Sequence, residues 1–152
     1  MIKYIDNEVS NPTYLFHGSS ILTDELEPRK AHDTDHNPEN EDCAVFLSSS
    51  FIVASAYAFQ NQIAEMSEGL KSDFCIGYNP DLNEPIIIMK DVIVSDDIEG
   101  YIYVFPFNEN YEHHGRSQQY KCHEKIKPIE IIKVKFSDFK DYYQINNIAK
   151  RR

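Results

Sequence analysis

The sequence lacks a long hydrophobic run. Its apolar stretches, such as Pro85 to Met89, are far shorter than the roughly 20 residues that an α-helix needs to cross a bilayer. The first residues, Met1 to Asp6, show neither the apolar stretch nor the small-residue cleavage site of a secretory signal. Cysteine is scarce too, and three cysteines at wide spacings do not suggest a disulfide framework. We therefore expect a cytoplasmic protein with reduced thiols and no membrane segment.

Positive charge is also in short supply. Lysine and arginine number 15 against 25 aspartate and glutamate residues, which gives a formal net charge of −10. Such a surface repels phosphate backbones, and this disfavours general binding to nucleic acids and to anionic membranes. One local basic cleft on this surface would still be compatible with a dinucleotide.

Several common functional motifs are absent. The sequence contains no Gly-rich phosphate loop, no paired Cys-x-x-Cys, no zinc-protease helix and no Gly-x-Ser-x-Gly elbow. His113–His114 and Cys122 with His123 match no zinc module, so we expect no metal. Cys43 lies beside an acidic loop whose carboxylates disfavour a thiolate, which favours a structural role.

The size and order of the hydrophobic segments predict one α+β domain over residues 1–152. A chain of this length with 41% hydrophobic residues can bury one core but has little room for two. Helical patterns come early and strand patterns come late, which is typical of the α+β class. The expected strands are residues 13–17, 44–47, 74–78, 85–89, 100–105 and 129–136.

One helix is predicted from the spacing of apolar residues. Ile52, Ala56, Phe59 and Ile63 are separated by four, three and four positions, which places them on one helical face. The serines at 48–50 can cap its first turn, and the helix is expected to run to about Ser67 and to stop near Gly69.

Two further segments carry weaker signals. Residues Lys30 to Asp42 are almost wholly polar, which predicts a loop; it is either an exposed excursion without chemistry or a lid over a substrate. Residues Ser137 to Tyr143 are expected to form a short terminal helix with Ser137 as its cap.

The candidate site starts at the end of the first strand, at His17-Gly18-Ser19. The histidine taken alone is typical of a hydrogen-bonded turn, whereas the glycine after it would let a ligand approach the backbone, because no Cβ intervenes. Tyr57 follows Phe46 of the second strand by eleven residues. An aromatic residue at such a position is usually part of a core.

Taken together, Tyr14–Ser19 and Val45–Tyr57 resemble the ADP-ribosyltransferases of the diphtheria-toxin and poly(ADP-ribose) polymerase branch. In that branch one strand carries His-Gly-Ser, and a second strand carries an aromatic residue followed by small residues and a tyrosine-bearing helix. The match covers roughly residues 13 to 60. It implies an ADP-ribosyltransferase-like split antiparallel β core with a few short helices.

The resemblance also implies a cleft that binds NAD as a substrate. His17 would hydrogen-bond the adenosine ribose, the Gly18 backbone would hold the nicotinamide carboxamide, and Tyr57 would stack on the nicotinamide ring. Nicotinamide would leave through an oxocarbenium-like state, and an acceptor would capture the ribosyl carbon. The residues implied to bind NAD are His17, Gly18, Ser19, Phe46, Ser48 and Tyr57.

This sequence departs from the family pattern at two positions. The second-strand aromatic is Phe46, where the branch usually has tyrosine. The family's glutamate, which binds the nicotinamide ribose and orients the acceptor, falls at Gln119 or, in another register, at Glu124. Glutamine can hydrogen-bond a ribose hydroxyl, but it cannot act as a base.

Three functions follow as hypotheses. The first is an NAD-dependent ADP-ribosyltransferase-like enzyme, a glycosyltransferase without a metal, acting on a protein or small-molecule acceptor. The second is a catalytically silent relative that binds a nucleotide or a modified macromolecule. The third is an interaction protein in which His17 and Tyr57 are structural.

Overall fold

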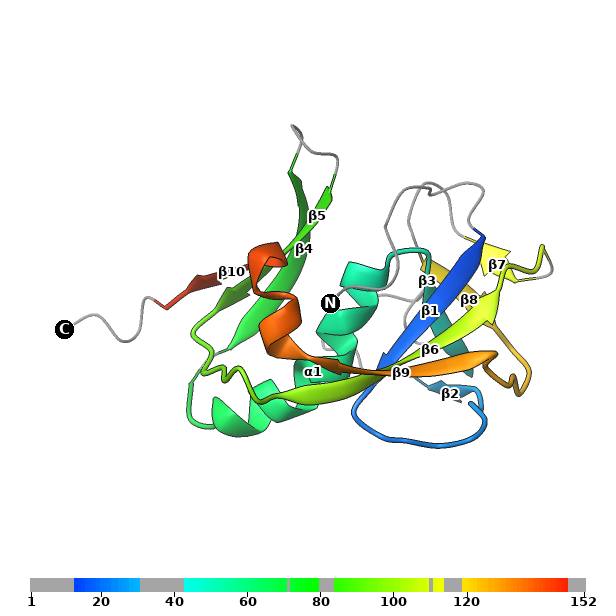
Figure 1. The fold of residues 1–152 in the computed structure, drawn as a ribbon, viewed down its shortest axis with the longest axis horizontal. Coiled ribbons are helices and arrows are strands. Elements are labelled where there is room, and N and C mark those ends of the chain that lie inside the picture. The colour runs from blue at the N-terminus through cyan, green and yellow to red at the C-terminus, as the bar shows by residue number, and fades with distance from the viewer. Residues whose placement is uncertain are drawn as a thin grey trace.

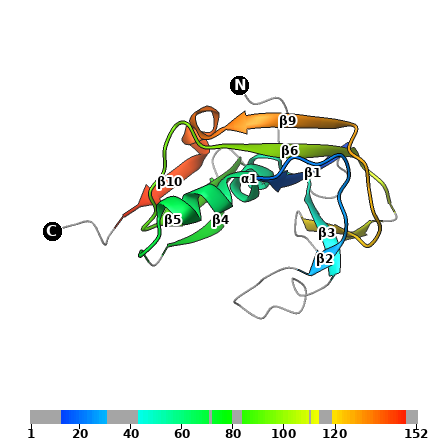
Figure 2. The same ribbon diagram turned by 90° about the horizontal axis from the view of Figure 1, so that it is seen from below.

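In the computed structural model one long α-helix packs between two β-sheets (Figures 1 and 2). The structure describes residues 13–30, 43–70, 72–79, 84–109, 111–113 and 119–147. The strands of the larger sheet are β1 (Tyr14–Ser19), β2 (Arg29–Lys30), β3 (Cys43–Ser48), β6 (Glu99–Pro106), β7 (Glu112–His113), β8 (Gln119–Cys122) and β9 (Glu130–Lys135). The other elements are α1 (Phe51–Met66), β4 (Asp73–Asn79), β5 (Glu84–Lys90), the 3₁₀-helices η2 (Phe136–Asp138) and η3 (Lys140–Tyr142), and β10 (Tyr143–Asn146).

The larger sheet places β1 at its centre. Its strand order is β7-β8-β3-β1-β6-β9, with β2 paired to β3, and every one of these pairs is antiparallel. The smaller sheet has the order β10-β5-β4, in which β10 runs parallel to β5. The structure therefore confirms the α+β class, because mostly antiparallel strands are combined with a separate helix.

Helix α1 begins and ends where the sequence predicts. Ser50 is its N-cap, and the Ser50 hydroxyl accepts a hydrogen bond from the backbone N–H of Val53 at 2.9 Å. The C-cap is Ser67, and Gly69 follows with a φ of 89°, a left-handed conformation that suits glycine. The predicted helix and its serine cap are confirmed.

The main core lies around α1, between the two sheets. Phe16, Ile102 and Val104 of the larger sheet and Ile87 and Met89 of β5 belong to the same buried cluster as the helix. Each sheet has an apolar face that must be covered, and α1 covers both of these faces. One continuous core therefore connects the two sheets.

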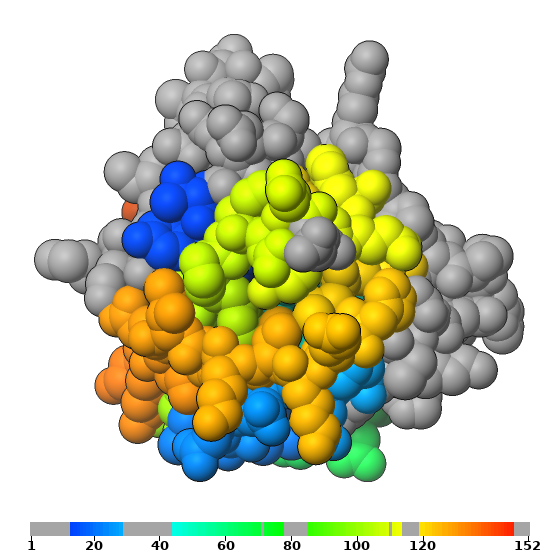
Figure 3. Space-filling model, turned by 90° about the vertical axis from the view of Figure 1, so that its right-hand side faces the viewer, coloured from blue at the N-terminus to red at the C-terminus, as the bar shows by residue number. Residues whose placement is uncertain are grey.

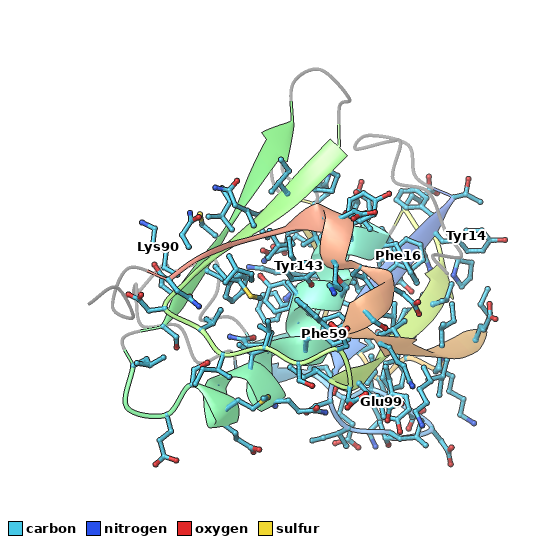
Figure 4. The ribbon with its side chains drawn as sticks, turned by 60° about the vertical axis from the view of Figure 1, so that its left-hand side comes forward. Tyr14, Phe16, Phe59, Lys90, Glu99 and Tyr143 are labelled. Atoms are coloured by element: carbon cyan, nitrogen blue, oxygen red, sulfur yellow. The ribbon has the colours of Figure 1, made fainter. Side chains whose placement is uncertain are left out.

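Aromatic rings fill the part of this core where η2 and η3 pack near α1. Phe59 of α1 and Tyr143 of β10 lie together there, with ring centroids 6.4 Å apart (Figure 4). The Tyr143 hydroxyl is 2.7 Å from the Ser55 hydroxyl. Burial raises the pKa of Tyr143 well above its usual value, so this phenol stays neutral at any physiological pH.

A second cluster covers the opposite face of the larger sheet, and Tyr103 of β6 is its most informative member. The Tyr103 side chain is fully buried. Its hydroxyl donates to the carbonyl of Ile21 at 2.6 Å and accepts from the N–H of Thr23 at 2.8 Å. The loop that follows β1 is thereby fixed to this face, close to the candidate site.

The structure corrects two expectations about the first part of the chain. Strand β1 continues through Gly18 to Ser19, where a turn is expected, because β6 pairs with it over that whole length. Lys30 lies in the short strand β2; residues 31–42, the rest of the expected loop, are outside the described residues.

The C-terminal segment also differs from the expected single helix. Residues 136–142 form η2 and η3, neither of which has a side-chain cap, and β10 follows directly. Phe136 and Phe139 are both buried, and their spacing of three matches one 3₁₀ turn. These two anchors favour tight turns over an α-helix.

Several remaining expectations concern single features. None of the helices in the described part of the chain is long and apolar enough to cross a membrane. Cys75 and Cys122 are free thiols, and nothing is described for the side chain of Cys43. In residues with described positions, no group of three or more His, Cys, Asp or Glu side chains could hold a metal ion.

Candidate functional site

The candidate site lies where the larger sheet divides between β1 and β3. Strand β1 pairs with β6 along its whole length, but its register with β3 is limited to Phe16 opposite Ser48. Beyond this pair the imidazole of His17 connects the two strands: His17 Nδ1 lies 2.8 Å from the carbonyl oxygen of Phe46. A carbonyl oxygen only accepts hydrogen bonds, so Nδ1 carries the proton and, in the neutral ring, Nε2 is the acceptor.

The His17 ring is held from a second direction by Tyr103. The two residues are opposite each other on β1 and β6, and their ring centroids are 6.0 Å apart in an edge-on arrangement. The same Tyr103 hydroxyl fixes the loop after β1. His17 is therefore preorganised in both position and tautomer, which suits a ligand-binding side chain and is equally compatible with a structural one.

Gly18 meets α1. A Cβ on Gly18 would collide with the carbonyl oxygen of Ala54 and would lie 2.7 Å from the backbone nitrogen of Ala58. The space that the glycine leaves is taken by the helix, and not by a ligand as the sequence suggests. The helical turn from Ala54 to Ala58 also carries Tyr57, so Gly18 lies against the turn of α1 to which Tyr57 belongs.

Tyr57 itself is 46% exposed, although an apolar environment is the usual expectation for such a residue. Its ring meets the ring of Phe74 on β4 edge-on, with centroids 5.9 Å apart. Tyr57 thus lies at the boundary between α1 and the smaller sheet. An exposed tyrosine that is held at one edge can offer a ring surface for stacking.

Gln119 is brought next to Ser48. These residues are opposite each other on β8 and β3, and Ser48 is in turn opposite Phe16, so the three form one row across the sheet. Residues in such a row share a face. Phe16 packs against Phe51 of α1, with ring centroids 5.3 Å apart, which identifies the face as the α1 side.

The next row holds a residue that the sequence analysis missed. Lys121 is opposite Phe46, and its Nζ lies 5.7 Å from the centroid of the Phe46 ring, within reach of a cation–π interaction. Lys121 is only 2% exposed and is the one charged side chain among the buried residues that the structure describes. Alternate residues of a strand point to the same face, so Lys121 could have been placed on the face of Gln119 if this segment had been predicted as a strand.

Glu124 lies apart from this row and lines a pocket beyond the end of β8. Figure 3 views the face of the molecule on which the yellow and orange part of the chain, from β7 to β9, gathers. The pocket has a volume of about 400 Å³. It is lined by Asn108, Tyr111, Lys121, Cys122, His123, Glu124 and Ile126. Burial, and then the nearby Cys122 thiol, raise the pKa of Tyr111. Gln119 is the first residue of β8, whereas Glu124 follows the end of that strand, so the structure brings only Gln119 next to Ser48.

Ser19 stabilises the turn after β1. Its hydroxyl accepts a hydrogen bond from the N–H of Ile21 at 3.1 Å. The following residue, Ser20, accepts from the side-chain amide of Asn61 on α1 at 3.0 Å. The end of β1 is therefore tied to the helix on the same side as Tyr57.

Comparison with known proteins gives no relative for this chain. No family model matches the sequence, and neither the curated proteins nor the solved structures contain a match. A function must therefore be inferred from the residues at the divided sheet.

Proposed function

We propose that this chain is an ADP-ribosyltransferase-like enzyme that binds NAD where β1 and β3 separate. The observation that carries the proposal is the single pairing between these strands together with the His17 bridge to the Phe46 carbonyl. The division places the end of β1 and the fixed imidazole of His17 beside β3, and we expect the ligand to bind there. This arrangement is also what the ADP-ribosyltransferase-like split β core requires.

The proposed reaction follows from the chemistry of NAD. The bond between ribose C1′ and the nicotinamide nitrogen breaks, and its electron pair leaves with nicotinamide. An oxygen or nitrogen atom of the acceptor bonds to C1′ and loses its proton. His17 and Ser48 hold ribose hydroxyls, the Gly18 backbone holds the carboxamide, and Tyr57 covers the nicotinamide ring. The acceptor is a protein or a small molecule, because the net charge of −10 disfavours nucleic acid.

A calorimetric titration with NAD tests the proposal. The wild-type protein is expected to bind NAD, and His17→Ala is expected to lose most of this binding while it remains folded. The control is His113→Ala, since His113 stacks on Tyr120 and belongs to β7, which β8 separates from β3. Absence of NAD binding by the wild-type protein would contradict the proposed function and would favour a protein whose His17 and Tyr57 are structural.

Tyr57→Ala is expected to weaken NAD binding by about 1–3 kcal/mol, the range measured for aromatic–base stacking. The substitution removes the ring surface that would stack on nicotinamide. Because Tyr57 is half-exposed, its loss should lower the stability of the fold only slightly. Tyr57→Phe is the matched control, because it keeps the ring and should keep the affinity. An unchanged affinity in Tyr57→Ala would show that this residue does not contact the nicotinamide ring.

A catalytically silent relative is the second candidate, and Gln119 is the observation that favours it. Gln119 occupies the row of Ser48, and an amide in this place supplies no base. Under this alternative the wild-type protein binds NAD but releases no nicotinamide, even when acceptors are supplied. Chromatographic measurement of nicotinamide beside the titration separates the two functions.

A further inference from the structure

The smaller sheet has an edge strand, β4, that is open to pairing with another strand. Within the described residues β4 pairs only with β5. Exposed edge strands are usually protected by short length, charged side chains, proline or a β-bulge. Strand β4 is seven residues long, its register with β5 is continuous from Asp73 to Asn79, and it contains no proline. Its one charged residue, Asp73, is the first, so the centre of the strand has none of these protections.

The other edge strands in the described part of the chain are protected. Strands β2 and β7 have two residues each and β10 has four, so each of them offers few backbone groups to a partner. Strand β9 is longer, but it carries charges at Glu130, Lys133 and Lys135. Strand β4 is therefore the edge best suited to pair with a strand of another molecule.

Apolar side chains are exposed along β4. Ile76 is 39% exposed, although Ile87, the residue opposite it on β5, is fully buried. On the other face of the sheet Cys75 is exposed, and it lies opposite Ile88, which is half-buried. A sheet face in contact with water normally carries polar side chains. Burial of these apolar side chains would therefore stabilise a further pairing at this edge.

We infer that two copies of this chain associate by antiparallel pairing of their β4 strands, which gives a dimer with two-fold symmetry. An axis at Ile76 places the Ile76 residues of the two copies opposite each other, and it places Cys75 opposite the partner's Gly77. Asp73 then lies opposite the partner's Asn79, so no two carboxylates face each other in the paired strands. The contact is thus free of like-charge repulsion, although each copy has a net charge of −10.

A second copy fits this edge better than a single strand from another protein. An added single strand would itself become a new open edge of the sheet. Pairing of two β4 strands instead gives the order β10-β5-β4-β4-β5-β10, in which both outer strands are the short strand β10. The centre of β4 also carries no charge by which a charged partner would be recognised.

Sedimentation velocity over a range of protein concentrations, under reducing conditions, tests this dimer. The wild-type protein is expected to shift reversibly from the monomer to twice its mass as the concentration rises. Ile76→Lys would place two ammonium groups opposite each other at the axis, so it should raise the dissociation constant of the dimer about tenfold or more. Ile129→Lys is the matched control, because Ile129 is 59% exposed and precedes β9 of the larger sheet. It should leave the dissociation constant within about twofold of the wild type.

Crosslinking at Cys75 tests the register of the pairing. The two Cys75 residues would lie diagonally across the axis on one face of the sheet, roughly 7–8 Å apart. A bismaleimide with a spacer of about this length should join them into a covalent dimer. Cys75→Ser should abolish this product, since Cys122 is buried.

Each outcome supports or overturns the dimer. A wild-type protein that remains monomeric at every concentration would overturn it, and so would a dimer that Ile76→Lys weakens no more than Ile129→Lys does. Absence of a covalent dimer that depends on Cys75 would overturn the pairing about Ile76. Thermal melting checks the fold, and Cys75→Lys, at an exposed position, replaces Ile76→Lys if the latter does not fold. None of these measurements requires NAD, so the dimer is tested independently of the proposed function.

Discussion

Gly18→Ala is expected to lower the free energy of unfolding by about 3 kcal/mol, the upper part of the range for overpacking a core. The added methyl group would collide with the carbonyl oxygen of Ala54, and it would stand 2.7 Å from the backbone nitrogen of Ala58. These atoms belong to the backbone of α1, so they cannot move aside as a flexible side chain can. The helix must instead shift away from β1, and urea denaturation measures the cost.

Gly77→Ala is the matched control for this prediction. Gly77 also lies in a strand, but the nearest atom to its Cβ position is the end of the Ile88 side chain at 3.4 Å. This substitution should change stability by less than about 1 kcal/mol, because no backbone atom obstructs it. Equal stabilities of Gly18→Ala and Gly77→Ala would contradict the close contact between β1 and α1.

The long elements of this fold follow from local patterns. Helix α1 carries its own apolar period and its own serine cap, and β5, β6 and β9 are long enough for their composition to identify them. The short strands β2, β7 and β10 carry no such pattern. They form because another strand offers backbone groups to pair with; for β10 this partner is distant in sequence, as with Ile87 opposite Tyr143. Such tertiary pairing leaves little trace in a single sequence.

The candidate site, like the fold, was predictable from the sequence only in part. His17, Gly18 and Tyr57 stand out from their motifs, but only the structure shows that the helix takes the space that Gly18 leaves. The choice between Gln119 and Glu124 depends on where β8 begins and ends, because Gln119 pairs with Ser48 within the sheet and Glu124 follows the end of the strand. Lys121 is recognisable as special only when its burial is known.

Gln119→Glu is expected to raise the release of nicotinamide from NAD by about a hundredfold or more, the usual contribution of a positioned acid–base group. The register places this side chain in the row of Ser48, on the α1 side of the divided sheet. A carboxylate there would stabilise the positive charge that develops on the ribose and would accept the proton of the acceptor. Chromatography of nicotinamide at saturating NAD measures the rate.

Gln144→Glu on the exposed side of β10 is the control, since it adds the same charge far from the site and should leave the rate unchanged. No gain in Gln119→Glu, together with a loss of activity in Glu124→Ala, would transfer the role to the pocket beside Cys122.

Lys121 determines how far the new carboxylate can act. Residues 119 and 121 share a face of β8 and lie about 7 Å apart along the strand. The ammonium group favours the ionised form of a carboxylate at 119, so the base is available at neutral pH. The same positive charge opposes the cationic transition state, and part of the gain is lost. Under the proposed function, Gln119→Glu combined with Lys121→Met should therefore release nicotinamide faster than Gln119→Glu alone at saturating NAD.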